Sequence, residues 1–115
     1  MIKVTETSRE LEKVEQYLMT QASNIKVVKD IPDGTKINVK AWCKFVDTKE
    51  DGTEVELLSI LDDNKVAYSC QSATFKRSFL DIADLMGEEF TIVKTSGTTN
   101  AGRPYVNCEL DVASL

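Results

Sequence analysis

The chain has 115 residues and a net charge of −5, with 42% hydrophobic and 29% charged residues. This length and composition fit one domain, which we expect to span residues 1–115, because the chain is too short to bury two cores. No apolar run reaches the roughly 20 residues that cross a bilayer, and residues 1–10 lack the apolar stretch of a signal peptide. We therefore expect a cytoplasmic protein with no membrane partner.

The sequence contains no histidine, which limits the chemistry it can perform. The usual general base, the commonest metal ligand and every Ser/His or Cys/His nucleophile pair are missing. Cys43, Cys70 and Cys108 are widely spaced and lie in apolar segments, which predicts free buried thiols in a reducing compartment. The acidic residues between positions 47 and 56 lack the spacing of a calcium loop. We expect no enzyme activity, no metal site and no cofactor.

Residues 1–34 predict an N-terminal amphipathic helix and a lead-in segment. Thr7 and Glu10 have the spacing of a capping box. The apolar residues that follow recur on one helical stripe: Leu11, Val14 and Leu18. Residues 24–31 predict a short irregular strand, and residues 31–34 (IPDG) predict a tight turn.

Residues 35–112 predict three strands, a helix and two more strands. The strands are expected at about 35–47, 54–61, 65–70, 89–95 and 103–112. The helix is expected to begin after an N-cap at Ser72 and to end at Gly87. This order predicts an all-β fold with added helices, specifically an OB-fold, the five-stranded barrel that binds oligonucleotides or oligosaccharides. An open five-stranded sheet fits the same order.

The first of these strands, TKINVKAWCKF (residues 35–45), alternates apolar and basic side chains. In a regular strand, one face would carry Ile37, Val39, Ala41, Cys43 and Phe45, and the other Lys36, Asn38, Lys40, Trp42 and Lys44. Cations beside an exposed aromatic ring are what single-stranded nucleic acid requires, because cations follow the phosphates and bases stack on rings. Two readings stay open: a ligand-binding face, or an ordinary solvent face with Trp42 covered by the N-terminal helix.

The last two expected strands supply further candidates. Lys94 ends the fourth strand, and Arg103 and Tyr105 share the outward side of the fifth. The intervening loop resembles a phosphate-binding loop only in its two glycines, and no helix follows it, so we exclude nucleotide hydrolysis. We interpret residues 96–102 as a mobile polar arm that closes over a bound strand, with a plain solvated hairpin as the alternative.

The run FKRSFLDIADLMGEEFTIVKTSGTTNAGRPYVNCEL (residues 75–110) resembles the C-terminal half of small bacteriophage single-stranded DNA-binding proteins. The likeness extends loosely over residues 35–112, since VKAWCKF and VAYSC are compatible with that family. It implies an OB-fold that coats single-stranded DNA during replication or recombination in the host cytoplasm, without sequence preference and without chemistry.

The resemblance also implies roles for individual residues. Trp42 and Tyr105 would be stacking platforms, and the phosphate partners would be Lys36, Lys40, Lys44, Lys94 and Arg103. Replication proteins and a second copy of the chain are partners that the sequence leaves open. The alternative function is a protein-interaction module built on the same small barrel. Trp42 discriminates between the two, because a nucleic-acid binder needs it accessible whereas an interaction module can bury it.

Overall fold

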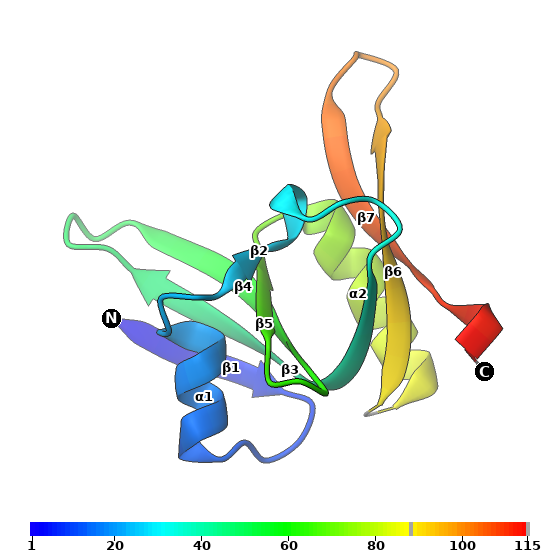
Figure 1. The fold of residues 1–115 in the computed structure, drawn as a ribbon. Helices are drawn as coiled ribbons and strands as arrows, with labels where there is room; N and C mark the ends of the chain where they lie inside the picture. The colour runs from blue at the N-terminus through cyan, green and yellow to red at the C-terminus, as the bar shows by residue number, and fades with distance from the viewer. Residues whose placement is uncertain (88, 115) are drawn as a thin grey trace.

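The computed structural model describes residues 1–87 and 89–114 and shows a mostly β fold with two helices (Figure 1). The strands are β1 (Ile2–Thr7), β2 (Lys26–Val27), β3 (Lys36–Thr48), β4 (Glu54–Asp62), β5 (Ala67–Cys70), β6 (Phe90–Thr98) and β7 (Pro104–Leu110). The helices are α1 (Lys13–Thr20) and α2 (Ala73–Met86), with the 3-10 turns η1 (Val28–Asp30) and η2 (Val112–Ser114). No helix in this described part is long and apolar enough to cross a membrane.

All seven strands belong to one mixed sheet with the order β2-β5-β4-β3-β6-β7, and β1 pairs with β3 outside this path. Every pairing is antiparallel except that of β2 with β5, which is parallel. The sheet curls into a half-barrel (Figure 1). Within the described residues β7 pairs only with β6, so the barrel stays open between β7 and the β2–β5 edge.

The predicted order of strands and helix after residue 34 corresponds to β3, β4, β5, α2, β6 and β7. The caps of α2 are as predicted: the Ser72 hydroxyl accepts a hydrogen bond from the Phe75 amide at 3.3 Å, and Gly87 ends the helix with φ of 90°. The turn at Gly34 is also confirmed, since the Thr35 amide donates to the Pro32 carbonyl at 3.2 Å. These features follow from local signals. The sheet adds β1 to the expected strands, and the short strand expected over residues 24–31 is reduced to the two residues of β2, followed by η1.

The N-terminal prediction is wrong in its boundaries. The helix begins only at Lys13, after a capping box formed by Glu12 and Glu15, and residues 2–7 form strand β1 instead. Ile2 and Val4 alternate with polar residues at the strand period and pair along the outer half of β3. Because an unpaired edge of β3 was available, the strand period of these residues prevailed over the apparent cap.

A β-bulge in β3 overturns the predicted division of its two faces. Val39 pairs with Asp62 and Ala41 with Leu61, so β3 advances two residues while β4 advances one, and Lys40 is the extra residue. A bulge reverses the alternation beyond it. Trp42 therefore joins the core on the side of Ile37 and Val39, opposite Lys36 and Lys40, which were expected beside it.

The bulge divides the apolar residues of β3 between two cores. One core joins α2 to the inner side of the curled sheet, through Phe75 and Phe79. The other lies under α1, where Leu11 and Met19 pack against the part of β3 beyond the bulge. The residues of β3 that enter this second core are Ala41, Cys43 and Phe45. Both faces of β3 are thus buried at Ala41, Trp42 and Cys43.

Candidate functional site

Trp42 is a core residue with 7% exposure. Its ring meets that of Phe79 from α2 edge-on, with the centroids 6.1 Å apart. The element that covers it is therefore α2 and not the N-terminal helix. An indole in this position presents no open face on which a base could stack, so the expected stacking platform at Trp42 is not present in this conformation.

The three lysines of the predicted stripe each lie beside a carboxylate. The pairs are Lys36 with Asp111 at 3.2 Å, Lys40 with Glu89, and Lys44 with Glu6 at 3.5 Å. The hydrogen bond from Lys40 to Glu89 raises the pKa of this ammonium group. Since carboxylates of the chain already neutralise these cations, the stripe is a weaker attractor of phosphate than the sequence predicted. The bulge places Trp42 on the face opposite Lys36 and Lys40.

Lys94 is buried, with 4% exposure. Its ammonium group donates to the Asp33 carboxylate at 2.7 Å, and the Ser96 hydroxyl donates to the other oxygen of the same carboxylate. These two hydrogen bonds, that from Lys94 first, lower the pKa of Asp33. Lys94 is thus an internal cation with a partner, whereas the sequence placed it at an exposed strand end.

Arg103 and Tyr105 lie on the β6–β7 hairpin, which projects from the body of the molecule (Figure 1). Arg103 is exposed and forms no ion pair with a described residue. Tyr105 is 37% exposed, and its ring occupies the space beside Gly97, the residue opposite it in the strand register. Both predicted residues are accessible, on an arm distant in the fold from the Trp42 core.

The connection between β6 and β7 is a hydrogen-bonded turn. Strand β6 continues to Thr98, so residues 96–98, which were predicted as loop, belong to the sheet. The Thr99 amide donates to the Arg103 carbonyl at 2.8 Å, and Gly102 adopts a φ of 85°. In the structure the two strands themselves extend the arm as a hydrogen-bonded hairpin.

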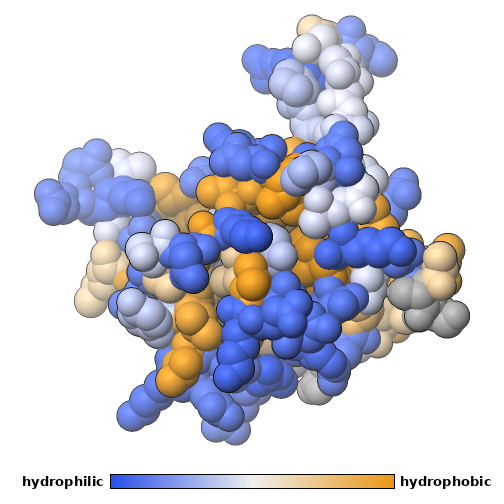
Figure 2. Space-filling view, viewed as in Figure 1, coloured by the Kyte–Doolittle hydropathy of each residue, from blue (hydrophilic) through white to orange (hydrophobic). Residues whose placement is uncertain are grey.

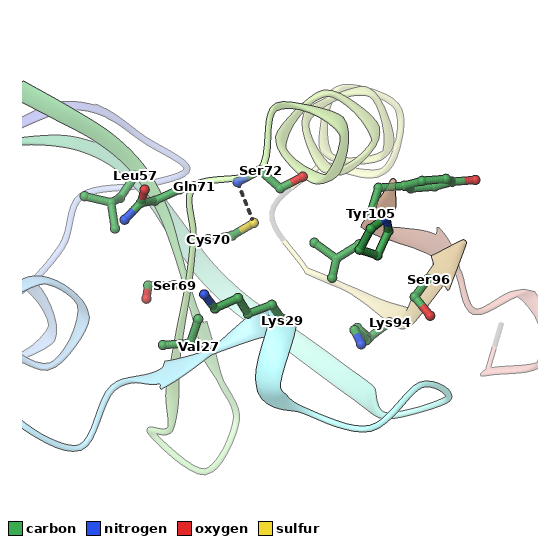
Figure 3. A pocket seen from close by; sticks show the side chains of 12 residues that line it. Val27, Lys29, Leu57, Ser69, Cys70, Gln71, Ser72, Lys94, Ser96 and Tyr105 are labelled. Carbon is green, nitrogen blue, oxygen red and sulfur yellow. Dashed lines mark hydrogen bonds between the residues drawn. The ribbon is translucent and has the colours of Figure 1, made fainter. Parts of the chain in front are cut away.

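A cavity of about 610 Å³ lies at the open side of the half-barrel, between the β2–β5 edge and the β6–β7 hairpin (Figure 3). Its wall includes Val27 and Lys29 on one side, Cys70 at the base, and Lys94 and Val106 on the other. Figure 2 shows apolar surface in this region between two hydrophilic hairpin tips. The cavity brings together residues that lie far apart in the sequence.

Lys29 is the cavity residue that sequence reasoning missed. It is exposed on η1, it forms no ion pair with a described residue, and its side chain extends toward Ser69 (Figure 3). The segment KVVKD carries two lysines, but its position in the fold depends on the parallel pairing of β2 with β5. No local signal in the sequence indicates that pairing.

The seven predicted residues do not form one surface. Lys94 and Tyr105 line the first cavity, whereas Trp42 lines a second cavity of about 450 Å³ together with Glu6, Asp81 and Asp84. Among the described residues, no group of three or more histidine, cysteine, aspartate or glutamate side chains is placed to hold a metal ion. Comparisons with protein-family models, with curated proteins and with solved structures find no match to this chain.

Proposed function

We propose that this protein binds single-stranded DNA along the open side of its half-barrel, as a non-enzymatic OB-fold-like protein of a phage or mobile element. The observation that carries the proposal is the place of the cavity. In OB-folds the ligand lies across the second and third strands, flanked by the loops between strands one and two and between strands four and five. Here those positions correspond to β4, β5 and the β3–β4 and β6–β7 hairpins. The cavity wall takes Leu57, Cys70 and Val106 from three of these parts.

The side chains around this cavity suit an extended strand of nucleotides. Val27, Leu57 and Val106 offer apolar contact to sugars and bases, and Lys29 offers a cation to the phosphates. Arg103, which forms no ion pair with a described residue, extends the cationic surface along the β6–β7 hairpin. In the proposal Lys29 and Arg103 replace the lysine stripe as the main phosphate partners, because neither has to give up an ion pair with a described carboxylate in order to bind phosphate.

Tyr105 is the proposed stacking platform. Its ring borders Gly97, where no side chain competes for space, and more than a third of the residue is open to solvent. An aromatic side chain held over a glycine on a projecting hairpin is pre-positioned, which reduces the entropy lost when a base stacks on it. Trp42 has no direct role in this arrangement.

One observation favours the alternative, a protein-interaction module. The sequence predicts an accessible Trp42 in a nucleic-acid binder, whereas an interaction module can bury it, and Trp42 is buried. The indole lines a cavity together with Glu6, Asp81 and Asp84. Carboxylates around an aromatic side chain repel phosphate and attract cationic groups. In this alternative the second cavity would face a basic segment of a protein partner.

The proposal is tested by fluorescence anisotropy of a labelled 20-nucleotide oligothymidine and of a matched duplex across a salt series. The protein should bind the single-stranded oligonucleotide and not the duplex. If Lys29 and Arg103 are the only two phosphate contacts, the slope of log K against log salt is about −1.4, whereas the five cations predicted from the sequence would give about −3.5.

Substitutions locate the binding surface. Lys29→Ala and Arg103→Ala should each reduce the magnitude of the slope by about 0.7, the share of one phosphate contact. Lys13→Ala is the matched control, since Lys13 is an exposed lysine on α1, away from the cavity wall. Absence of binding to single strands at low salt would contradict the proposal and make the protein-interaction module the better explanation.

A further inference from the structure

The turn before β3 and the inner face of β6 meet at one carboxylate. Asp33 accepts a hydrogen bond at each of its oxygens, from the Lys94 ammonium group at 2.7 Å and from the Ser96 hydroxyl. Lys94 and Ser96 are two residues apart on β6, so their side chains leave the same face of the strand. Both line the first cavity, and Asp33 does not (Figure 3).

The two partners differ strongly in burial. The Lys94 side chain is 5% exposed and that of Asp33 is 56% exposed. The cation is therefore fixed in the wall, and the carboxylate approaches it from the solvent side. A buried ammonium group is destabilised when no anion compensates it, because burial removes its hydration. In the free protein Asp33 supplies that anion.

The turn that carries Asp33 does not depend on its carboxylate. The Gly34 amide donates to the Lys94 carbonyl at 2.8 Å, and the Lys94 amide donates to the Thr35 carbonyl at 2.9 Å. The Thr35 hydroxyl also donates to the Pro32 carbonyl at 2.6 Å. Because these bonds anchor the turn through its backbone, the Asp33 side chain can rotate into solvent while the turn stays in place.

We propose that Lys94 and Ser96 form a phosphate-binding site that the Asp33 carboxylate occupies until a phosphodiester group of the bound strand replaces it. This inference rests on the proposed function and assigns a regulatory role to Asp33 within the same site. A phosphodiester presents anionic oxygens to the same two donors, and charge-assisted hydrogen bonds of this kind are the strong ones. The exchange keeps Lys94 compensated throughout and returns Asp33 to water.

The exchange makes Asp33 an internal competitor. A phosphodiester group that binds to Lys94 has to displace the Asp33 carboxylate. The gain from the new contact is offset by the loss of the old one, so Lys94 adds little to the DNA affinity of the unaltered protein. Removal of the competitor should release that contribution. A purely structural ion pair predicts the reverse, because loss of Asp33 would then only disturb the wall of the cavity.

The test compares Asp33→Asn with Asp30→Asn in the anisotropy titration. Asn retains an oxygen that can accept from Lys94 or Ser96, and thermal unfolding confirms that each variant folds. Asp30 is a matched control, since it is exposed, lies three residues away on η1 and forms no ion pair with a described residue. Asp33→Asn should bind single strands about fivefold more tightly than Asp30→Asn, within the range of one released ion pair. Its salt slope should be steeper by about 0.7, the share of one phosphate contact.

A second substitution assigns the gain to Lys94. In the Asp33→Asn background, Lys94→Met should return both the affinity and the slope to those of the unaltered protein. If Asp33→Asn binds no more tightly than Asp30→Asn while both bind DNA, the inference is wrong and the proposed function stands.

Inorganic tripolyphosphate separates the inference from the proposed function. If no variant binds DNA but tripolyphosphate shifts the Lys94 NMR signals in Asp33→Asn and not in Asp30→Asn, the phosphate site is supported and DNA binding is refuted. If Asp33→Asn binds neither single-stranded DNA nor tripolyphosphate, both the phosphate site and the proposed function are refuted.

Discussion

The contact between Gly97 and Tyr105 yields a prediction that the structure defines closely. A Cβ atom built on Gly97 would lie 2.5 Å from the phenolic oxygen of Tyr105 and 2.6 Å from Cζ, closer than real Cβ atoms come. The φ of Gly97 is outside the left-handed region, so the backbone itself accepts alanine. The tyrosine ring is therefore the obstacle to the substitution Gly97→Ala.

The size of the effect follows from two opposing contributions. Alanine in place of glycine stabilises a compatible backbone by about 0.4–1 kcal/mol, because it restricts the unfolded chain. The ring of Tyr105 must turn aside, and holding a side chain off its preferred rotamer costs about 0.5–1.5 kcal/mol. With Tyr105 present, the net effect of Gly97→Ala should lie between a stabilisation of about 0.5 kcal/mol and a destabilisation of about 1 kcal/mol. In a Tyr105→Ala background only the gain of about 0.4–1 kcal/mol remains.

Urea unfolding of the four proteins in this double-mutant cycle, followed by the fluorescence of Trp42, measures the coupling. The expected coupling free energy is about 0.5–1.5 kcal/mol, equal to the cost of displacing the ring. If Gly97→Ala changes the unfolding free energy equally in both backgrounds, to within about 0.3 kcal/mol, the ring does not occupy the space beside the glycine and the reasoning is refuted. The same cycle in the DNA titration reports whether the displaced ring still stacks.

Three further predictions concern stability and thiol chemistry. Hydrogen bonding to Arg9 lowers the pKa of Glu15 from 4.5 to about 2, so this contribution to stability is complete above pH 4.5 and is lost as the pH falls toward 2. Glu15→Gln should therefore show a smaller loss of unfolding free energy over that interval than the unaltered protein. Phe79→Ala should cost about 3–5 kcal/mol in urea unfolding, because the ring is fully buried. Burial raises the pKa of Cys43 and Cys108 to about 12, so a disulfide reagent at pH 8 should modify them only after unfolding.

The predictions for Glu15 and Phe79 each have a control substitution. Leu85→Ala, on the same helix as Phe79 but 81% exposed, should change stability little. Glu10→Gln removes an exposed carboxylate outside the Arg9–Glu15 ion pair, and it should leave the acid sensitivity intact. Equal acid profiles for Glu15→Gln and the unaltered protein, or rapid modification of the native thiols, would contradict the corresponding structural assignment.

The sequence by itself determined the order of the main elements. The change of apolar period from two to about 3.6 separates the strands from α2, and Ser72 and Gly87 mark the ends of that helix. The Asp-Gly sequences at residues 33–34 and 51–52 mark two turns, and both glycines adopt a φ of 87°. These signals are local, because each acts through residues within one or two turns of the chain.

The tertiary structure decided which residues share a surface. The bulge at Lys40 arises from the register between β3 and β4, and it places Trp42 in the core, on the face opposite Lys36 and Lys40. The pairing of β2 with β5 brings Lys29 to the cavity, and the turn at Asp33 supplies the partner of Lys94. Strand register and ion pairing depend on residues that are distant along the chain, so the alternation of TKINVKAWCKF could indicate a strand but could not indicate what either of its faces would touch.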